Sequence, residues 1–130
     1  MKRAIAAIIV LAILITVSVL EVIYVEDRLG SLKDHMTALY QYMEQDKDNI
    51  NTPLNKQMIE DIEREWEKDK KIFNFLFSHN QINELTYKIV SLNTYISQND
   101  YNMANTAAAT IIKNCDLLLS YFYPKLENIL

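Results

Sequence analysis

The first 20 residues of the chain constrain its fold more than any later segment. Lys2 and Arg3 stand directly before a run without charged residues, from Ala4 to Leu20. At about 1.5 Å per residue, a helix of this length reaches about 25 Å, close to the hydrocarbon thickness of a bilayer. We therefore predict that residues 1–25 form a membrane anchor and that residues 26–130 form a helical domain.

Two other interpretations of this segment fit less well. A cleavable signal peptide needs small residues at its processing site, whereas residues 19–25 read VLEVIYV. A buried helix that is apolar on all sides needs a large core around it, which a chain of 130 residues does not readily provide. An uncleaved anchor is therefore the favoured interpretation.

The charges on either side of the apolar run predict its orientation. Lys2 and Arg3 precede the run, whereas acidic residues outnumber basic residues between positions 21 and 34. Positive charge is retained on the cytoplasmic side of a membrane. The expected location is the cell membrane, with a single pass, a cytoplasmic N-terminus and an extracytoplasmic C-terminal domain.

The composition limits the fold class that residues 26–130 can adopt. One glycine and two prolines are far fewer than turn-rich β folds use. A net charge of −4 argues against a nucleic-acid partner. The lone cysteine, Cys115, cannot form an internal disulfide, and its place in an apolar pattern predicts a small buried side chain. We expect an all-α domain without disulfides.

Apolar residues recur at spacings of three and four in four segments, which is the pattern of amphipathic helices. Thr52 before Pro53, Ser78 three residues before Gln81, and Asp100 mark helix starts. The predicted apolar stripes comprise Val22, Val25, Leu29, Leu32, Met36, Leu39 and Met43; Leu54, Met58, Ile62, Trp66, Phe73 and Leu76, widened by Ile59, Ile72 and Phe77; Ile82, Leu85, Ile89, Leu92 and Ile96; and Tyr101, Ala104, Ala108, Ile111, Cys115, Leu118 and Phe122.

These segments predict an N-terminal transmembrane helix followed by a four-helix antiparallel bundle. The alternative is a pair of stacked helical hairpins of the tetratricopeptide type, with a turn of that kind around Asp100. Gly30 and Ser31 either interrupt the stalk between the anchor and the first soluble helix, or lie within a continuous helix. Pro124 is expected to end the last helix, and the residues after it, Leu126, Ile129 and Leu130, to fold back as a short tail.

The polar residues form no pattern that indicates catalysis. His35 and His79 lack the spacing of haem, zinc or di-iron ligands. The acidic residues from Glu60 to Glu67 alternate with basic ones, as on a solvated helix face. A single glycine, Gly30, excludes a glycine-rich phosphate loop. We therefore expect no enzymatic activity, no metal and no cofactor.

The densest cluster of aromatic and aliphatic residues lies just before His79. Such residues usually build core, but those between positions 72 and 77 cover more of the helix circumference than one buried stripe needs. The surplus predicts an interaction surface. Its candidate residues are Trp66, Phe73, Phe75, Phe77 and His79.

Two hypotheses of function follow from these features. The leading one is a membrane-tethered helical module, without catalytic activity, that binds a protein partner and contacts membrane lipid through its N-terminal helix. The alternative is a helical bundle that senses a small apolar ligand or a lipid held between its helices.

Several short stretches of the chain together form a recognisable pattern: Lys2 and Arg3; Trp66, Glu67, Lys68, Lys70 and Lys71; Phe77, Ser78, His79 and Ile82; Leu92, Tyr95, Ile96, Asp100 and Ala104; and residues 126–130. In these residues the chain resembles an uncharacterised family of short, single-span membrane proteins with a domain of unknown function, from clostridia-like Gram-positive bacteria. Members tend to carry an acidic residue after the histidine, where this chain has Asn80 and Gln81. The resemblance implies membrane attachment, a helical domain and another integral membrane protein as a partner, and it implies no activity.

Overall fold

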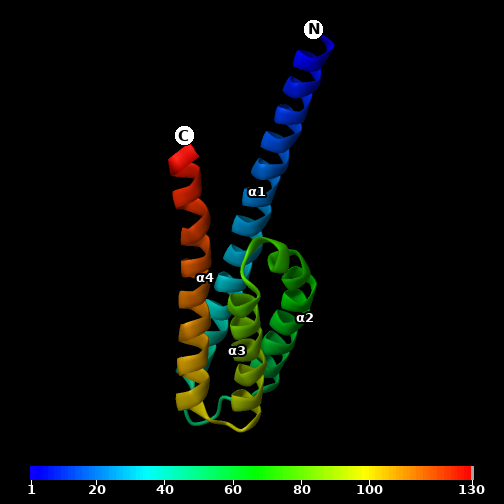
Figure 1. Ribbon diagram of the computed structural model, residues 1–130. Helices are drawn as coiled ribbons and strands as arrows, with labels where there is room; N and C mark the ends of the chain where they lie inside the picture. Colours follow the sequence, from blue (N-terminus) through cyan, green and yellow to red (C-terminus); the bar gives the residue numbers. More distant parts are fainter. Residues whose placement is uncertain (130) are drawn as a thin grey trace.

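The computed structural model describes residues 1–129, with side chains through residue 121. Within this range it contains four α-helices: α1 (Lys2–Gln45), α2 (Pro53–Leu76), α3 (His79–Ser97) and α4 (Tyr101–Ile129). Consecutive helices run in opposite directions and are joined by short connections (Figure 1). α1 packs against α2 and α4, and α3 also packs against both, so the helices close into a ring. The fold is an up-and-down four-helix bundle rather than two stacked hairpins.

The expected anchor and the first helix of the bundle form one continuous helix. α1 contains 44 residues and has no break at Gly30 or Ser31. Every residue through Glu21 is exposed, and the first buried residue is Val25. The N-terminal half of α1 projects beyond the bundle (Figure 1), and α1 is the one helix in the described residues that is long and apolar enough to cross a membrane.

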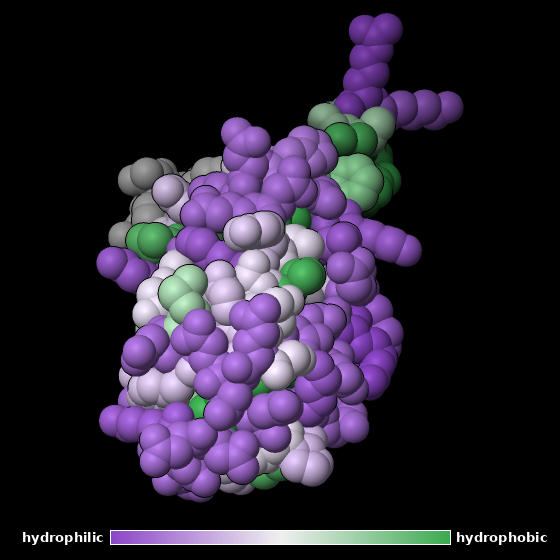
Figure 2. Space-filling model, turned by 90° about the horizontal axis from the view of Figure 1, so that it is seen from below, coloured by the Kyte–Doolittle hydropathy of each residue, from purple (hydrophilic) through white to green (hydrophobic). Residues whose placement is uncertain are grey.

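The surface of the bundle differs in character from this projecting segment. In the view of Figure 2, hydrophilic residues cover most of the bundle, whereas strongly hydrophobic residues gather on the segment of α1 that projects at the upper right. The projecting segment has a small hydrophilic tip at its far end. This distribution matches a helix with a long apolar stretch and two basic residues at its start.

The core of the bundle follows a heptad pattern in all four helices. Inward residues alternate at spacings of four and three, as in bundles whose helices cross at about 20°. The predicted stripes of the first, third and fourth segments are confirmed, apart from Val22 and Tyr101, which are half-buried, and Phe122, whose side chain lies outside the described residues. The buried residues of these stripes are Val25, Leu29, Leu32, Met36, Leu39 and Met43 in α1, Ile82, Leu85, Ile89, Leu92 and Ile96 in α3, and Ala104, Ala108, Ile111, Cys115 and Leu118 in α4.

The buried stripe of α2 is rotated relative to the prediction. Leu54 is 51% exposed, whereas Ile59 is fully buried. The heptad spacing that begins near Ile59 passes through Trp66 and Phe73 and places Asp69 at the inward position between them. Apolar periodicity locates four members of this stripe, Ile59, Ile62, Trp66 and Phe73, and misses Asn55 and Asp69 because both are polar.

The predicted helix starts are confirmed by hydrogen bonds to the first turns. The hydroxyl of Thr52 accepts a hydrogen bond from the backbone N–H of Asn55 at 3.1 Å. Ser78 and Gln81 form the capping box that their spacing predicts. A carboxylate oxygen of Asp100 accepts a hydrogen bond from the backbone N–H three residues later at 3.2 Å. Each bond satisfies a backbone donor that the helix itself leaves free.

The predicted end of the last helix is wrong. α4 continues past Pro124 to Ile129, so the backbone through residue 129 does not fold back as a tail. A proline removes one backbone donor and disfavours a helix interior, but it does not prevent the helix from continuing. Leu130, the last residue of the expected tail, lies outside the described residues.

Asn99 joins the two loops at the end of the bundle far from the N-terminus. Its φ of 55° lies in the left-handed region, which asparagine tolerates better than most residues. Its Oδ1 accepts a hydrogen bond from the backbone N–H of Ile50 at 2.7 Å, and its Nδ2 donates to the carbonyl of Asp48 at 2.9 Å. The α1–α2 loop and the α3–α4 turn are therefore fastened to each other.

We predict that Gly30→Ala stabilises the protein. A Cβ atom at Gly30 would meet no atom within 4 Å, and the φ of this glycine is not positive. Because alanine favours a helix interior by about 1 kcal/mol over glycine, G30A should raise the free energy of unfolding by about 0.5–1 kcal/mol. Denaturant titration of the detergent-solubilised protein, followed by circular dichroism, measures this. Gly30→Pro is the control and should destabilise by about 3 kcal/mol; a destabilising G30A would contradict the continuous helix.

Candidate functional site

The structure separates the five residues of the predicted interaction surface. Trp66 and Phe73 are 2% and 1% exposed and belong to the core. Phe77 is half-buried and packs edge-on against Phe73, with ring centroids 5.9 Å apart. Phe75 is 90% exposed, and His79 is also exposed. The five residues therefore form no single surface, and of the five only Phe75 and His79 present a largely accessible side chain.

Helix geometry explains this division. Trp66 and Phe73 are seven residues apart and so lie along the inward face of α2, while Phe77, the extended residue just after the helix, packs against Phe73. Phe75 follows Phe73 by two residues, which at about 100° per residue places it on the opposite face. The indole N–H of Trp66 donates to the hydroxyl of Thr86 at 2.8 Å, so its polar atom is satisfied within the core.

The best-defined polar cluster joins α1 to α2 near the end of the bundle from which the apolar N-terminal segment of α1 projects. Nε of Arg28 donates to Oδ2 of Asp69 at 2.9 Å, and its Nη2 donates to Oε2 of Glu65 at 2.7 Å. The phenol of Tyr24 donates to Oδ1 of Asp69 at 3.0 Å. Asp69 is only 9% exposed, so a carboxylate at a core position is held by two side chains of α1.

This cluster is suited to fixing the position of α1 against α2. The hydrogen bond to Asp69 raises the pKa of Arg28 above its ordinary value, which keeps the guanidinium charged. Both carboxylate oxygens of Asp69 are already occupied by Arg28 and Tyr24. The one sequence signal of this cluster was the gap that Asp69 leaves in the apolar stripe of α2.

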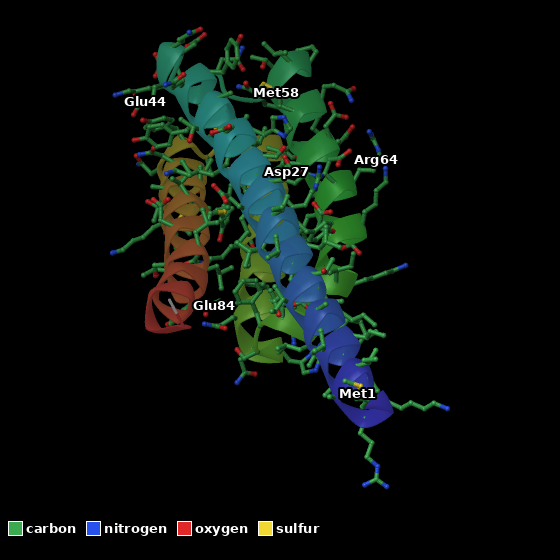
Figure 3. The ribbon with its side chains drawn as sticks, turned by 90° about the horizontal axis from the view of Figure 1, so that it is seen from above. Met1, Asp27, Glu44, Met58, Arg64 and Glu84 are labelled. Carbon is green, nitrogen blue, oxygen red and sulfur yellow. The ribbon has the colours of Figure 1, made fainter. Side chains whose placement is uncertain are left out.

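A groove of about 370 Å³ opens between α1 and α2 on the side of this cluster away from the apolar N-terminal segment. Its apolar surface comes mainly from the half-buried Met58 of α2, with the buried Ile62 at its floor. Figure 3 shows α2 beside α1, with Met58 near the start of α2 and Arg64 further along it. The charged and polar residues that line the groove are His35, Asp61, Arg64 and Glu65. The groove can therefore hold an amphipathic segment, which needs both apolar and charged contacts.

The interior of the bundle gives no support to the ligand-sensing hypothesis. The inward side chains of the described residues are closely packed, and most core residues are fully buried. The groove between α1 and α2 and a smaller one of about 140 Å³ between α3 and α4 are open at the surface, and a third pocket between α1 and α2 holds only about 10 Å³. A ligand held between helices needs an enclosed apolar chamber instead.

The side chains of residues 1–121 form no group of three or more His, Cys, Asp and Glu that could hold a metal ion. Cys115 is fully buried in the seam of α4, as its place in the apolar stripe predicts. Burial raises the pKa of its thiol to about 12. At neutral pH this thiol is protonated and unreactive, so it acts as a small apolar side chain.

These features define an all-α protein in which a four-helix bundle is built on a long N-terminal helix that can cross a membrane. The chain belongs to the family described as Domain of unknown function (DUF4363), which matches residues 23–129. The match includes the whole bundle and begins next to the exposed apolar segment. No curated protein and no solved structure matches the chain significantly. Membership of a family with a domain of unknown function, which the sequence resemblance indicated, is confirmed.

We predict that Asp69→Ala destabilises the bundle by about 2–3 kcal/mol, because it leaves the partly buried Arg28 without its main partner. Denaturant titration measures the change in the free energy of unfolding. Asp61→Ala is a matched control, since Asp61 makes an ion pair with Arg64 on the solvent side of the same helix and should cost less than about 1 kcal/mol. Equal effects of the two substitutions would show that the Arg28–Asp69 contact does not join the helices.

Proposed function

We propose that this protein is a single-pass membrane protein whose helical bundle binds a partner protein outside the cytoplasmic membrane and carries out no catalysis. The observation that supports this best is the division of α1 into two halves. One half is apolar and fully exposed, and the other supplies core residues to the bundle. Large apolar side chains exposed on every side of a helix are unfavourable in water and favourable in lipid. In this proposal residues 1–25 are the anchor and residues 26–130 the extracytoplasmic domain.

The charges next to the apolar run support the proposed orientation. Lys2 and Arg3 precede it, and exposed acidic residues follow it at Glu21, Glu26 and Asp27. Basic residues remain on the cytoplasmic side during insertion. The bundle then lies on the outer side, and the unbroken α1 holds it at a fixed distance from the bilayer.

The groove between α1 and α2 is the surface that we assign to the partner. His35, on its α1 side, is 15 residues after Leu20, which places the groove about 22 Å from the end of the apolar run. A partner that is itself an integral membrane protein therefore needs an extracytoplasmic segment to reach Met58 and Ile62. Because both proteins are confined to one membrane, a weak contact in this groove is sufficient for association.

Several charged side chains outside the groove are paired within the bundle itself. On exposed faces, charged side chains pair along the same helix, as Lys70 does with Glu67 at 2.9 Å and Lys88 with Glu84 at 2.9 Å. Between helices, Lys33 of α1 pairs with Asp116 of α4 at 2.7 Å. Each of these charged groups therefore forms an ion pair with another side chain on the surface of the bundle.

The proposed orientation predicts where an introduced thiol can be labelled on intact cells. Tyr87 is exposed on α3, so Tyr87→Cys should react with a membrane-impermeant maleimide added outside. Lys2→Cys should react only after the membrane is permeabilised. The native Cys115 is buried and should stay unlabelled in both cases. Labelling of Y87C only after permeabilisation would exclude an outer location for the bundle.

The assigned groove predicts site-specific photo-cross-linking in native membranes. A photoreactive amino acid in place of Met58 should capture one defined protein, whereas the same residue in place of Val90, exposed on α3, should not. Arg64→Glu reverses a charge that lines the groove; if it weakens binding by about 1.4 kcal/mol, the captured fraction falls about tenfold. Equal capture from positions 58 and 90, or none from position 58, would count against this surface.

A further inference from the structure

Phe75 is a large aromatic side chain that the bundle leaves almost completely uncovered, at 90% exposure. It lies in the last turn of α2, close to the end of the bundle from which the N-terminal half of α1 projects. Two other large apolar side chains near this end are also exposed, Ile72 of α2 at 44% and Ile23 of α1 at 57%. We call Ile23, Ile72 and Phe75 the apolar collar.

The contacts between α1 and α2 show how high the collar lies along α1. Tyr24 contacts both Asp69, by the hydrogen bond of 3.0 Å, and Phe73, with ring centroids 6.0 Å apart. Tyr24 is therefore level with a point midway between these two residues of α2. The helices are antiparallel and both rise about 1.5 Å per residue. Phe75, about four residues beyond that point, is consequently level with Leu20, about four residues before Tyr24.

Leu20 is the last residue of the uncharged run, so Phe75 lies at the height where the apolar half of α1 ends. We propose that the last turn of α2 places Phe75 in the interfacial layer of the same bilayer that α1 crosses, with Ile23 and Ile72 at its boundary. This inference rests on the anchor of the proposed function. The occupant is lipid because the collar continues the apolar surface of the membrane-spanning segment, and interfacial layers accept aromatic rings at this depth.

The polar residues around the collar fit a lipid headgroup region. Lys71 is exposed one turn before Phe75 on the same face of α2, where its ammonium group can reach phosphates while its stem lies along the collar. Glu21 is exposed on α1 at nearly the same height as Phe75. Because charges of both signs are present, the contact does not depend on anionic lipid. A second contact beside the α1 span would limit tilting of the bundle on the membrane.

The test uses the full chain reconstituted in phosphatidylcholine nanodiscs. Phe75→Cys is labelled with an environment-sensitive fluorophore; Cys115 does not react because it is buried and its pKa is raised to about 12. Arg64→Cys is the matched control, since it lies on the same outward face of α2, 11 residues or about 16 Å further from the bilayer. Ile13→Cys, within the apolar run, reports whether the anchor is in lipid.

We expect brominated lipids to quench the F75C label about fivefold more than the R64C label, because quenching by lipid falls off steeply over a separation of about 16 Å. Iodide in the buffer should show the reverse order. An F75C label that behaves like the R64C label, while the I13C label is quenched by lipid, would overturn the collar contact and leave the anchor intact. An I13C label that stays in water would overturn both.

One further outcome separates lipid from a protein occupant. An F75C label that is accessible to iodide in nanodiscs but shielded in native membranes would show that a protein covers Phe75, which also overturns this inference. Misfolding is not expected to complicate the result, because a side chain that is 90% exposed contributes little to the core. The helical circular dichroism and melting temperature of F75C should match those of the unchanged protein.

Discussion

The whole structure depends on one unbroken helix, α1, whose two halves differ: one is apolar and exposed, and the other is packed into the bundle. Through Glu21, α1 is exposed and apolar on nearly every side, while from Val25 onward it buries residues at heptad spacing against α2 and α4. Helical geometry is transmitted along α1 without a flexible joint, since Gly30 lies within a regular helix. The direction of the buried seam therefore fixes how the bundle is rotated relative to the projecting segment.

The cluster of Arg28, Asp69 and Tyr24 fixes the position of α2 along the axis of α1. Burying a carboxylate at a core position costs free energy of desolvation. The best-attested use of such a group is to specify one alignment of two helices among several possible ones. Moving α2 along α1 by one heptad, about 10 Å, would keep apolar residues facing each other but would separate Asp69 from both partners. The same register sets Phe75 level with Leu20, so a buried ion pair determines which side chains lie nearest to the end of the apolar run.

Sequence periodicity was sufficient to identify the buried face of α1, α3 and α4, but not the whole buried face of α2. In α1, α3 and α4 every inward position of the described stripes is apolar, so the pattern of spacings identifies the buried face directly. In α2 the stripe includes Asp69, and the apolar residues around Phe73 cover several faces at once. Phe75 and Trp66 are both aromatic; their spacing places them on different faces of α2, and the neighbouring helices decide which of these faces is buried.

The sequence by itself determined the apolar N-terminal run, the four helical segments and the caps at Thr52, Ser78 and Asp100. These features depend on hydrogen bonds and periodicities within a few residues, which a linear pattern contains. Only the tertiary structure decided the closed ring, the continuity through Gly30 and the pairing of Arg28 with Asp69. The reason is that these features depend on contacts between distant segments. A glycine costs a helix about 1 kcal/mol, which the burial of a few side chains, at about 1.5–3 kcal/mol each, readily exceeds.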